Sequence, residues 1–355
     1  MDIWQWVVDA QADLYAAGHD RLADLMIELP RRVVSGDHQA AEALLPEALA
    51  LARSIDHAWI EIYLRHWIAQ SRVLHRYDVT RGMDDLIHLL DSAHEERTRE
   101  CPQSVCVVQD VCAAYGIIDG PGYVSERLAV STEALARIDP TWQCFECITC
   151  EHADALLDAG RYEDAERYVR TQLAVAARHD KDIYWGLRFH LVEALSRQGR
   201  HEEAAQLLEP PIHMGENRHE EIAYKLRKGR ELALLGRIEE AKRCAVPLRD
   251  IASGDYLLWA RASAAFCAAG AKTNDRRLDK TLRGFVTTLI GNGALYEPAE
   301  VALIAARLAL ARDDDREAAQ YLDEIETLAP RLRSPERIVA VVQELRAAIV
   351  SRVRT

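Results

Sequence analysis

The chain has 355 residues, of which 49% are hydrophobic and 28% are charged, and this composition is typical of a folded protein rather than a disordered one. Its formal net charge of −13 argues against a general surface for nucleic acids or anionic membranes, because binding a polyanion requires clustered Lys and Arg. No apolar stretch is long enough to span a bilayer, and acidic residues interrupt the apolar N-terminal segment, so no membrane span and no signal peptide are predicted.

The N-terminal part of the chain is predicted to be helical, because apolar residues recur there at the helical period. Four helices are expected before residue 77, followed by three more at about 83–96, 103–117 and 124–138. Pro30 and Pro46 fall inside helical patterns, and each is expected to kink or shorten its helix. Asp56 is the expected N-cap of the fourth helix.

Trp59, Tyr63 and Trp67 form an aromatic stripe on the fourth helix, since residues four apart lie on one helix face. Such a stripe could be a shelf for a ligand, but core packing is its more common role, and we expect packing here. The sequence DGPGY at 119–123 could be a phosphate-binding loop or a turn. Because a helical pattern rather than a strand precedes it and no Lys follows, a turn is predicted.

Three similar hexads organise the middle of the chain: GRYEDA at 160–165, GRHEEA at 199–204 and GRIEEA at 236–241. Each lies between two apolar helical patterns. Glycine can end the first helix because it adopts the left-handed conformation without a Cβ clash. The acidic pair suits the first turn of the next helix, where the helix dipole favours anions, and the small Ala allows the helices to approach closely. Repetition of this helix–junction–helix unit along the chain predicts stacked helical hairpins.

The junctions resemble those of the tetratricopeptide repeat family, whose hairpins carry a similar Gly-x-Tyr-x-x-Ala sequence. The match is good between residues 141 and 246 and looser at 36–41 and 312–319. The resemblance implies an all-α fold, with a single domain over residues 1–355 in which antiparallel helical hairpins form a right-handed solenoid. The repeats are longer than the family's usual period of about 34 residues, so longer helices or wider loops are expected.

Helices are also predicted for the C-terminal part, at about 255–269, 275–290, 298–312 and 315–328. The last helix, at 335–353, starts in a Ser-Pro-Glu sequence and carries one apolar stripe that includes Ile338, Val342 and Leu345. A terminal capping helix needs one apolar face for the array and one polar face for water, and this segment provides both.

Cys144, Cys147 and Cys150, followed by His152, are the strongest candidates for metal ligation, since three thiols and a histidine could hold zinc or an iron–sulfur cluster. Two observations favour packing instead. The fourth Cys of a ferredoxin-like run is missing. The segment is also expected to be one helix that begins at Asp139-Pro140, in which the thiols lie along a ridge rather than around a point.

A closed metal site on this segment would need a ligand from another helix, for which His190 is the nearest candidate by register. We therefore predict no metal and no cofactor. Cys106 and Cys112 are expected to pack in the core, as buried cysteines commonly do. The eight cysteines are expected to be reduced thiols in a cytoplasmic protein.

Two groups of basic residues lie on predicted helices about one hairpin apart. They are Lys225, Arg227, Lys228 and Arg230, and Arg276, Arg277, Lys280 and Arg283. Each group fits a solvated helix face. Each also fits a basic wall for an acidic peptide or a phosphate group.

In tetratricopeptide repeats the first helix of each hairpin lines the concave surface, and the resemblance implies groove residues six and ten positions before each junction glycine. These positions and their neighbours of interest are Cys150, Asp154, Phe189, His190, Glu193, Leu226, Arg227 and Arg230. The family's chaperone-binding members hold a C-terminal carboxylate with Lys and Asn at such positions, and neither residue stands there in this chain. We expect instead an acidic or phosphorylated end of a partner near Arg227 and Arg230, with an apolar side chain near Phe189.

The sequence contains no recognisable nucleophile–base motif, zinc-protease motif or phosphate-binding loop, so an enzyme is not expected. The function that fits best is a non-catalytic cytoplasmic scaffold or adaptor that binds a protein or peptide segment in the concave groove. The alternative is a regulatory sensor that responds to a small ligand, a metal or an oxidant through Cys144, Cys147 and Cys150. The sequence leaves the oligomeric state open.

Overall fold

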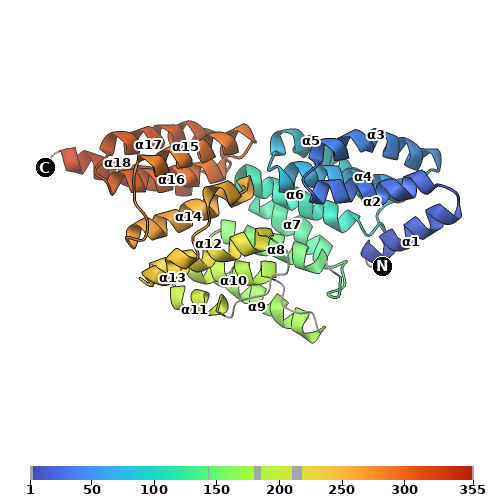
Figure 1. The fold of residues 1–355 in the computed structure, drawn as a ribbon, viewed down its shortest axis with the longest axis horizontal. Coiled ribbons are helices and arrows are strands. Elements are labelled where there is room, and N and C mark those ends of the chain that lie inside the picture. The colour runs from blue at the N-terminus through green and yellow to red at the C-terminus, as the bar shows by residue number, and fades with distance from the viewer. Residues whose placement is uncertain (1–2, 143, 180–184, 210–217, 354–355) are drawn as a thin grey trace. The chain divides into compact units, whose positions relative to one another are not determined.

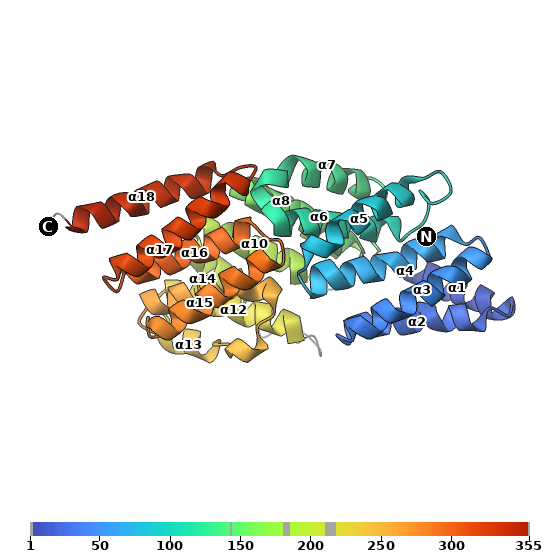
Figure 2. The ribbon, with the colours of Figure 1, turned by 90° about the horizontal axis from the view of Figure 1, so that it is seen from above.

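The computed structural model of the chain describes residues 3–142, 144–179, 185–209 and 218–353. These parts are mostly helical and contain no β-strand, which confirms the predicted all-α fold (Figures 1 and 2). The chain divides into two compact units. The first is mainly Met1–Tyr115 and Ser125–His152, and the second comprises Gly116–Val124, Ala153–Arg178 and Asp182–Thr355. No helix in the described ranges is both long and apolar enough to cross a membrane.

The first unit consists of the helices α1 (Ile3–Ala16), α2 (Asp20–Val34), α3 (His38–Ser54), α4 (Ala58–Gln70), α5 (Val79–His94), α7 (Val124–Leu135), and most of α6 (Ser104–Asp119) and α8 (Cys144–Asp158). The helices from α1 to α5 each pack against their neighbours in the sequence. The aromatic stripe on α4 packs in the core, as predicted. Tyr63 and Trp67 are buried, and the Tyr63 ring meets the ring of Trp6 on α1 with the centroids 5.8 Å apart.

The start of α4 differs from the prediction. Asp56 has a φ of 53°, so it occupies the left-handed position that ends α3 rather than the N-cap of α4. The N-cap is His57, whose ring nitrogen Nδ1 accepts the backbone N–H of Ile60 at 3.4 Å. Aspartate tolerates the left-handed conformation better than most residues, and it serves here where the three hexad junctions use glycine.

The start of α8 also differs from the prediction, because the helix begins at Cys144 rather than at Asp139-Pro140. Asp139 instead caps a turn, accepting the backbone N–H of Thr141 at 2.8 Å. Pro30 and Pro46 lie inside the helices α2 and α3, and each helix continues beyond its proline.

The second unit is a stack of helical hairpins. Its helices are α9 (Tyr162–Arg178), α10 (Trp185–Arg197), α11 (His201–Leu207), α12 (Arg218–Leu234), α13 (Ile238–Arg243), α14 (Tyr256–Ala268), α15 (Arg276–Gly291), α16 (Tyr296–Leu310), α17 (Asp315–Leu328) and α18 (Glu336–Val353). The helices α10, α12, α14 and α16 lie side by side in that order (Figure 1). The predicted capping helix corresponds to α18, which packs against α16 and α17.

The three hexads form the predicted helix–turn–helix junctions. Gly160, Gly199 and Gly236 have φ values of 71°, 75° and 72°, between α8 and α9, α10 and α11, and α12 and α13. At Gly160 the next backbone N–H, of Arg161, returns to the carbonyl of Leu156 at 3.0 Å, which satisfies a helix-end acceptor. The alanines that close the hexads are fully buried. The prediction drawn from the repeated hexad is confirmed.

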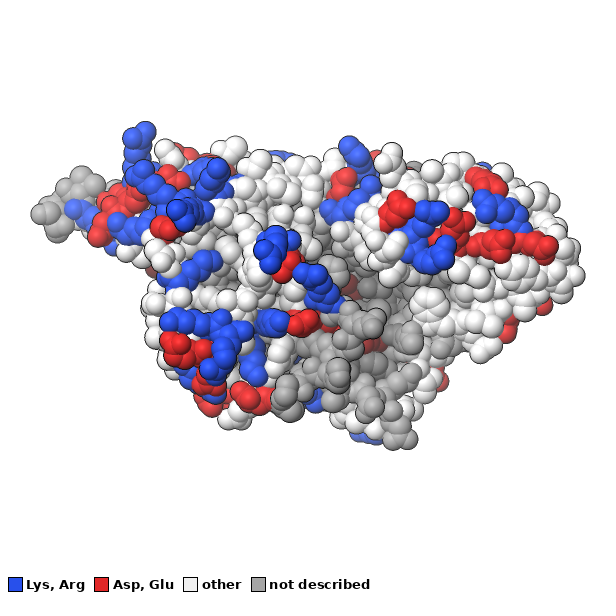
Figure 3. Space-filling view, in the orientation of Figure 1, with Lys and Arg blue, Asp and Glu red and all other residues white. Residues whose placement is uncertain are grey.

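Each hexad also contains an ion pair that the sequence analysis did not predict. The arginine after the glycine pairs with the acid three residues later, in Arg161–Asp164, Arg200–Glu203 and Arg237–Glu240, at 2.6–2.7 Å. These pairs are exposed or partly exposed, and each contributes little to stability by itself. Together with other short-range pairs they mix acidic and basic side chains on the surface (Figure 3).

The hairpin of α12 and α13 has a short second helix. The helix α13 has 6 residues and α11 has 7, compared with 17 in α9 and 14 in α17. Two short 3₁₀ turns, Leu248–Asp250 and Ser253–Asp255, fill the rest of the connection to α14. The expectation of wider loops holds for this repeat, and the shortened helix leaves parts of α12 and α14 without a covering helix.

The segment DGPGY forms a turn, as predicted. It is the 3₁₀ turn Gly120–Tyr123, and the buried carboxylate of Asp119 accepts the backbone N–H groups of Gly122 at 3.2 Å and Arg333 at 2.7 Å. The turn therefore joins two parts of the second unit that are far apart in the sequence. By accepting these two backbone N–H groups, the Asp119 carboxylate holds the two segments together.

Candidate binding surface

The predicted groove residues lie on the first helices of consecutive hairpins. Cys150 and Asp154 are on α8, Phe189, His190 and Glu193 on α10, and Arg227 and Arg230 on α12. Cys150 belongs to the first unit, and the other six belong to the second. Within the second unit, contacts join these residues in pairs across neighbouring helices.

Glu193 is the centre of an ionic network across four helices of the second unit. Its carboxylate contacts Arg230 of α12 at 2.7 Å, Arg261 of α14 at 3.3 Å and Arg197 of α10 at 2.8 Å. Arg261 in turn pairs with Glu300 of α16. We call these five residues the ionic ladder. They connect α10, α12, α14 and α16, so they help to set how consecutive hairpins align.

The ionic ladder is largely withdrawn from water, and its pKa values reflect this. Burial acts to raise the pKa of Glu193, but the nearby guanidinium groups of Arg230 and Arg261 outweigh it and hold that pKa well below its ordinary value. Burial also acts to raise the pKa of Glu300, but the nearby guanidinium of Arg261 outweighs it and lowers that pKa. Both carboxylates are therefore ionised at neutral pH.

Glu231 extends this network to a further helix. It is fully buried and accepts hydrogen bonds from Arg230 Nε at 2.7 Å and Ser196 Oγ at 2.9 Å, while His201 Nδ1 lies 2.8 Å from its other oxygen. These contacts fasten α10 and α11 to α12. Arg230, which is 5% exposed, is thus held between two carboxylates, Glu193 and Glu231.

Arg227, one turn earlier on α12, has a different environment. Its guanidinium lies over the ring of Phe189 on α10, 4.7 Å from the centroid, and Arg188 lies over the ring of Trp185 at 5.0 Å. The two rings adjoin, with centroids 5.9 Å apart. We call Trp185, Arg188, Phe189 and Arg227 the cation–aromatic cluster. Stacking of this kind suits arginine because its guanidinium is planar and weakly hydrated.

The two arginines of the cation–aromatic cluster lack acidic partners among the residues that the structure describes. Across the described ranges, no carboxylate lies within 4 Å of either Arg188 or Arg227, and Arg227 Nε has no hydrogen-bond partner. Burial lowers the pKa of Arg227, and the acids nearest to it are too far away to offset this. Arginine still stays protonated in proteins, so the cluster holds positive charge next to apolar rings.

Asp154 and His190 form a further pair between α8 and α10. The His190 Nε2 atom lies 3.0 Å from Asp154 Oδ1, and its Nδ1 atom lies 2.6 Å from the carbonyl oxygen of Gly186. Both ring nitrogens of His190 are therefore engaged within the second unit. These contacts differ from the metal-ligand role that the sequence analysis considered for His190.

Cys144, Cys147 and Cys150 lie on one continuous helix, α8, as predicted. Cys144 contacts Cys106 of α6, with 3.5 Å between the sulfur atoms, and His152 Nδ1 lies 2.9 Å from Ser131 Oγ. No group of three potential metal ligands converges in the parts that the structure describes. Burial is the main reason that the pKa of the Cys147 thiol lies far above its ordinary value, and the neighbouring thiols raise that pKa further.

A buried pair in the first unit was not predicted. His66 Nδ1 on α4 lies 2.7 Å from Asp110 Oδ2 on α6, and both side chains are almost completely buried. Burial raises the pKa of Asp110, although His66 acts in the opposite direction. The two residues are 44 positions apart, and no motif links them, so only the packing of α4 against α6 brings them together.

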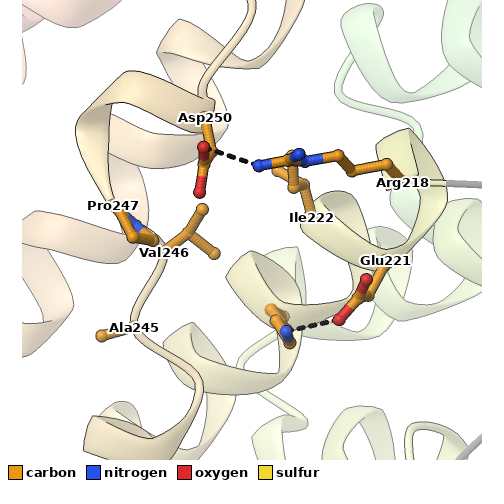
Figure 4. A pocket seen from close by; sticks show the side chains of 8 residues that line it. Arg218, Glu221, Ile222, Ala245, Val246, Pro247 and Asp250 are labelled. Carbon is orange, nitrogen blue, oxygen red and sulfur yellow. Dashed lines mark hydrogen bonds and ion pairs between the residues drawn. The ribbon is translucent and has the colours of Figure 1, made fainter.

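One cavity beside α12 illustrates a surface whose charges are satisfied. Its volume is about 340 Å³, and it lies between the start of α12 and residues 245–250 (Figure 4). Arg218 donates to Asp250 at 2.7 Å, and Lys225 pairs with Glu221. Because each cation on its wall already contacts a carboxylate, this cavity offers little charge for a further ligand.

No protein-family model matches the chain, and no curated protein does. Among solved structures, the chain is similar to a tetratricopeptide repeat protein from Parabacteroides merdae ATCC 43184, with 14% identity, a TM-score of 0.45, and coverage of 78% of this chain and 98% of that one. It is also similar to Ton1535 from Thermococcus onnurineus NA1, with 14% identity, a TM-score of 0.30, and coverage of 95% and 98%. The helical-hairpin architecture rests on the chain's own helices and junctions.

Sequence reasoning missed Arg261 and Glu300 of the ionic ladder, but part of the ladder left a signal. Glu193 and Arg230 occupy the same position in consecutive repeats, six residues before the junction glycine, and they have opposite charge. Because equivalent positions on stacked helices are neighbours, opposite charges there predict a pair. Arg261 and Glu300 follow no such register, so they could not be found in this way.

Proposed function

We propose that this protein is a non-catalytic cytoplasmic scaffold whose second unit binds an acidic segment of a protein partner at the cation–aromatic cluster. The observation that carries the proposal is the pair of arginines, Arg188 and Arg227, which are stacked on adjoining rings and lack acidic partners among the described residues. A carboxylate or phosphate can accept two hydrogen bonds from one guanidinium, and such bonds are stronger than those between neutral groups.

The apolar part of the partner would contact the edge of the same cluster. Phe189 is almost fully buried beneath Arg227, whereas Trp185 is partly exposed. Partly exposed tryptophan and arginine are common among the residues that dominate binding energy at interfaces. The residues Asp154, His190, Glu193 and Arg230 are proposed to border the bound segment and to hold the first helices in place around it.

Two features support binding rather than catalysis. The carboxylate of Glu193 is held by arginine, and a carboxylate whose pKa is strongly lowered is a weak base for proton transfer. The sensor alternative depends on reactive thiols at Cys144, Cys147 and Cys150. Burial raises the pKa of Cys147, so little of the reactive thiolate would form there.

The proposal can be tested with a library of random peptides displayed on phage and selected on the full-length protein. We expect selected peptides to carry Asp, Glu or both beside an aromatic or aliphatic residue. A synthetic peptide from the selection should bind Arg227→Met more weakly than the wild type by about 1–3 kcal/mol, the range for loss of an important interface side chain. Titration calorimetry would measure both affinities.

Arg276→Met is a matched control, because Arg276 is an exposed arginine at the start of α15 in the same unit. It removes the same charge from the chain and should leave peptide affinity unchanged. Selection of peptides without acidic residues would contradict the proposal. Equal weakening by Arg227→Met and Arg276→Met would also contradict it, since that result would show a dependence on net charge alone.

A further inference from the structure

A second cavity lies where the shortened α13 leaves α12 and α14 uncovered. Its volume is about 360 Å³. Its walls come from α12, from Lys242 near the end of α13 and the segment that follows it, from α14, and from residues 271–272. None of the residues of the cation–aromatic cluster lines it, so it is a separate site from the one proposed above.

The walls of this cavity are largely apolar. Leu226 of α12 and Trp259 and Phe266 of α14 are among its apolar lining residues, and Leu248, which also lines it, is 47% exposed. Phe266 can sit against α12 because Gly229 has no side chain: a Cβ atom there would come within 2.8 Å of the Phe266 ring. A cavity of this size with aromatic walls is typical of a site for a small molecule.

One polar group stands out inside this apolar setting, the ammonium of Lys272. Its Nζ atom lies 3.9 Å from the centroid of the Trp259 ring and donates to Ser263 Oγ at 2.9 Å. No carboxylate of the described residues lies within 4 Å of it. Since an ammonium has three N–H donors, the hydroxyl and the ring face leave one donor for another acceptor.

Lys242, which also lines the cavity, shows the contrast. It is half exposed and pairs with Glu239 at 2.8 Å, so its charge is already balanced. Lys272 is partly buried, and burial lowers its pKa. A cation held away from water without an acidic partner costs free energy, and an anion bound beside it would recover part of that cost.

We propose that this cavity binds a small carboxylic acid with an apolar body, in which the carboxylate contacts Lys272 and the body packs between Trp259, Phe266 and Leu226. A free small molecule fits better than a peptide because the cavity is bounded on several sides by α12, α14 and the segment that follows α13. The charge of Lys272 selects the anion, and the aromatic walls select the body.

The test uses 4-phenylbutyrate and octanoate as probes, each paired with its neutral alcohol, 4-phenylbutanol and octanol. Titration calorimetry on the full-length protein should show that each acid binds at least ten-fold more tightly than its alcohol. In Lys272→Met, which keeps the length of the side chain but removes its charge, that preference should disappear. Lys280→Met, on an exposed position of α15, should keep the preference.

A thermal melt separates binding from folding. Lys272→Met should have a Tm equal to or above that of the wild type, because it removes a partly buried charge without an acidic partner. Ala245→Trp, which adds bulk at an exposed position on the cavity wall, should abolish binding of both acids. The proposal would be overturned if neither acid binds, if acid and alcohol bind equally, or if the preference survives in Lys272→Met.

Discussion

The ionic ladder and the cation–aromatic cluster share the helices α10 and α12, but their arginines on α12 have different surroundings. Arg230 is buried between Glu193 and Glu231, with a carboxylate on each side. Arg227, three residues earlier, lies on the Phe189 ring and has no carboxylate within 4 Å in the described parts. A basic run on one helix can therefore contain both a cation paired with carboxylates and a cation with no carboxylate within 4 Å among the described residues.

The physical reason is the direction in which each side chain leaves α12. Residues three apart differ by about 300° around a helix, so they project along neighbouring but distinct lines. One line meets Glu193 at a position where the two helices pack closely, and the other meets an aromatic ring. An ion pair in such a site stabilises the contact only while both partners are present. The following predictions test this division between the two arginines.

The largest effect is expected for Arg230→Met. The change leaves the carboxylates of Glu193 and Glu231 buried with less positive charge nearby, and breaking a buried pair costs about 3–5 kcal/mol. Denaturant unfolding, followed by circular dichroism, would measure the loss. A cost below about 1 kcal/mol would show that Arg230 is not structurally required, and the contrast with Arg227 would fail.

A second substitution tests the close approach of α12 and α14 independently of the ion pairs. In Gly229→Ala, the new Cβ would lie 2.8 Å from Phe266 Cζ and 3.0 Å from Cys244 Cβ, so overpacking should destabilise the protein by about 1–3 kcal/mol. Gly284→Ala on α15 is the control, since its Cβ meets nothing within 4 Å. It should stabilise the helix by up to about 1 kcal/mol. Similar effects of the two substitutions would contradict the packing argument.

The ionic ladder should also respond to acid. The pKa of Glu193 is lower in the folded protein than its unfolded value of about 4.3, because Arg230 and Arg261 outweigh burial. The folded state therefore gains stability from this group above about pH 4.3, and the gain is lost as the pH falls through the folded pKa. Glu193→Gln should flatten the fall in stability between neutral and acidic pH, as measured by unfolding at several pH values. If stability depends on pH in the same way in Glu193→Gln and the wild type, the ionised Glu193 carboxylate does not stabilise the fold.

The smallest change in stability is expected for Arg227→Met. Because Arg227 has no acidic partner among the described residues, its removal leaves no carboxylate unpaired, and the methionine can still cover Phe189. We expect the free energy of unfolding to change by less than about 1 kcal/mol, while binding of a selected acidic peptide is weakened by about 1–3 kcal/mol, as described above. A melt that falls together with binding would assign Arg227 to the fold instead.

Much of the fold could be predicted because the information is local. A glycine followed by an acidic pair and a small residue specifies a helix end, a helix start and a close approach within six positions, and all three hexads behave in this way. The two wrong helix starts, at Asp56 and at Asp139, are also local matters. An aspartate accepts backbone N–H groups in turns as readily as at helix starts, so its presence does not decide between them.

The candidate sites depend on contacts between distant parts of the chain, and these could be predicted only in part. Phe189 was identified from the repeat register and Arg227 from the basic run around Leu226, but their stacking on one another was not predicted. Lys272 follows the last turn of α14 in a short loop, and its sequence surroundings are not distinctive. Its place in a cavity depends on the shortness of α13, on Gly229 and on the position of Trp259.

The amino-acid sequence by itself determined the helical hairpins and their junctions, because helix ends and amphipathic periods are set by neighbouring residues. Tertiary structure decided which charges on neighbouring helices are neutralised. Arg230 and Arg227 have the same side chain on the same helix, yet Arg230 has an acidic partner on α10, Glu193, and Arg227 has none among the described residues. Such a pair requires two groups within a few ångströms, and the packing of helices distant in the sequence sets that distance, whereas sequence spacing alone already places Lys242 and Glu239 on one helix face.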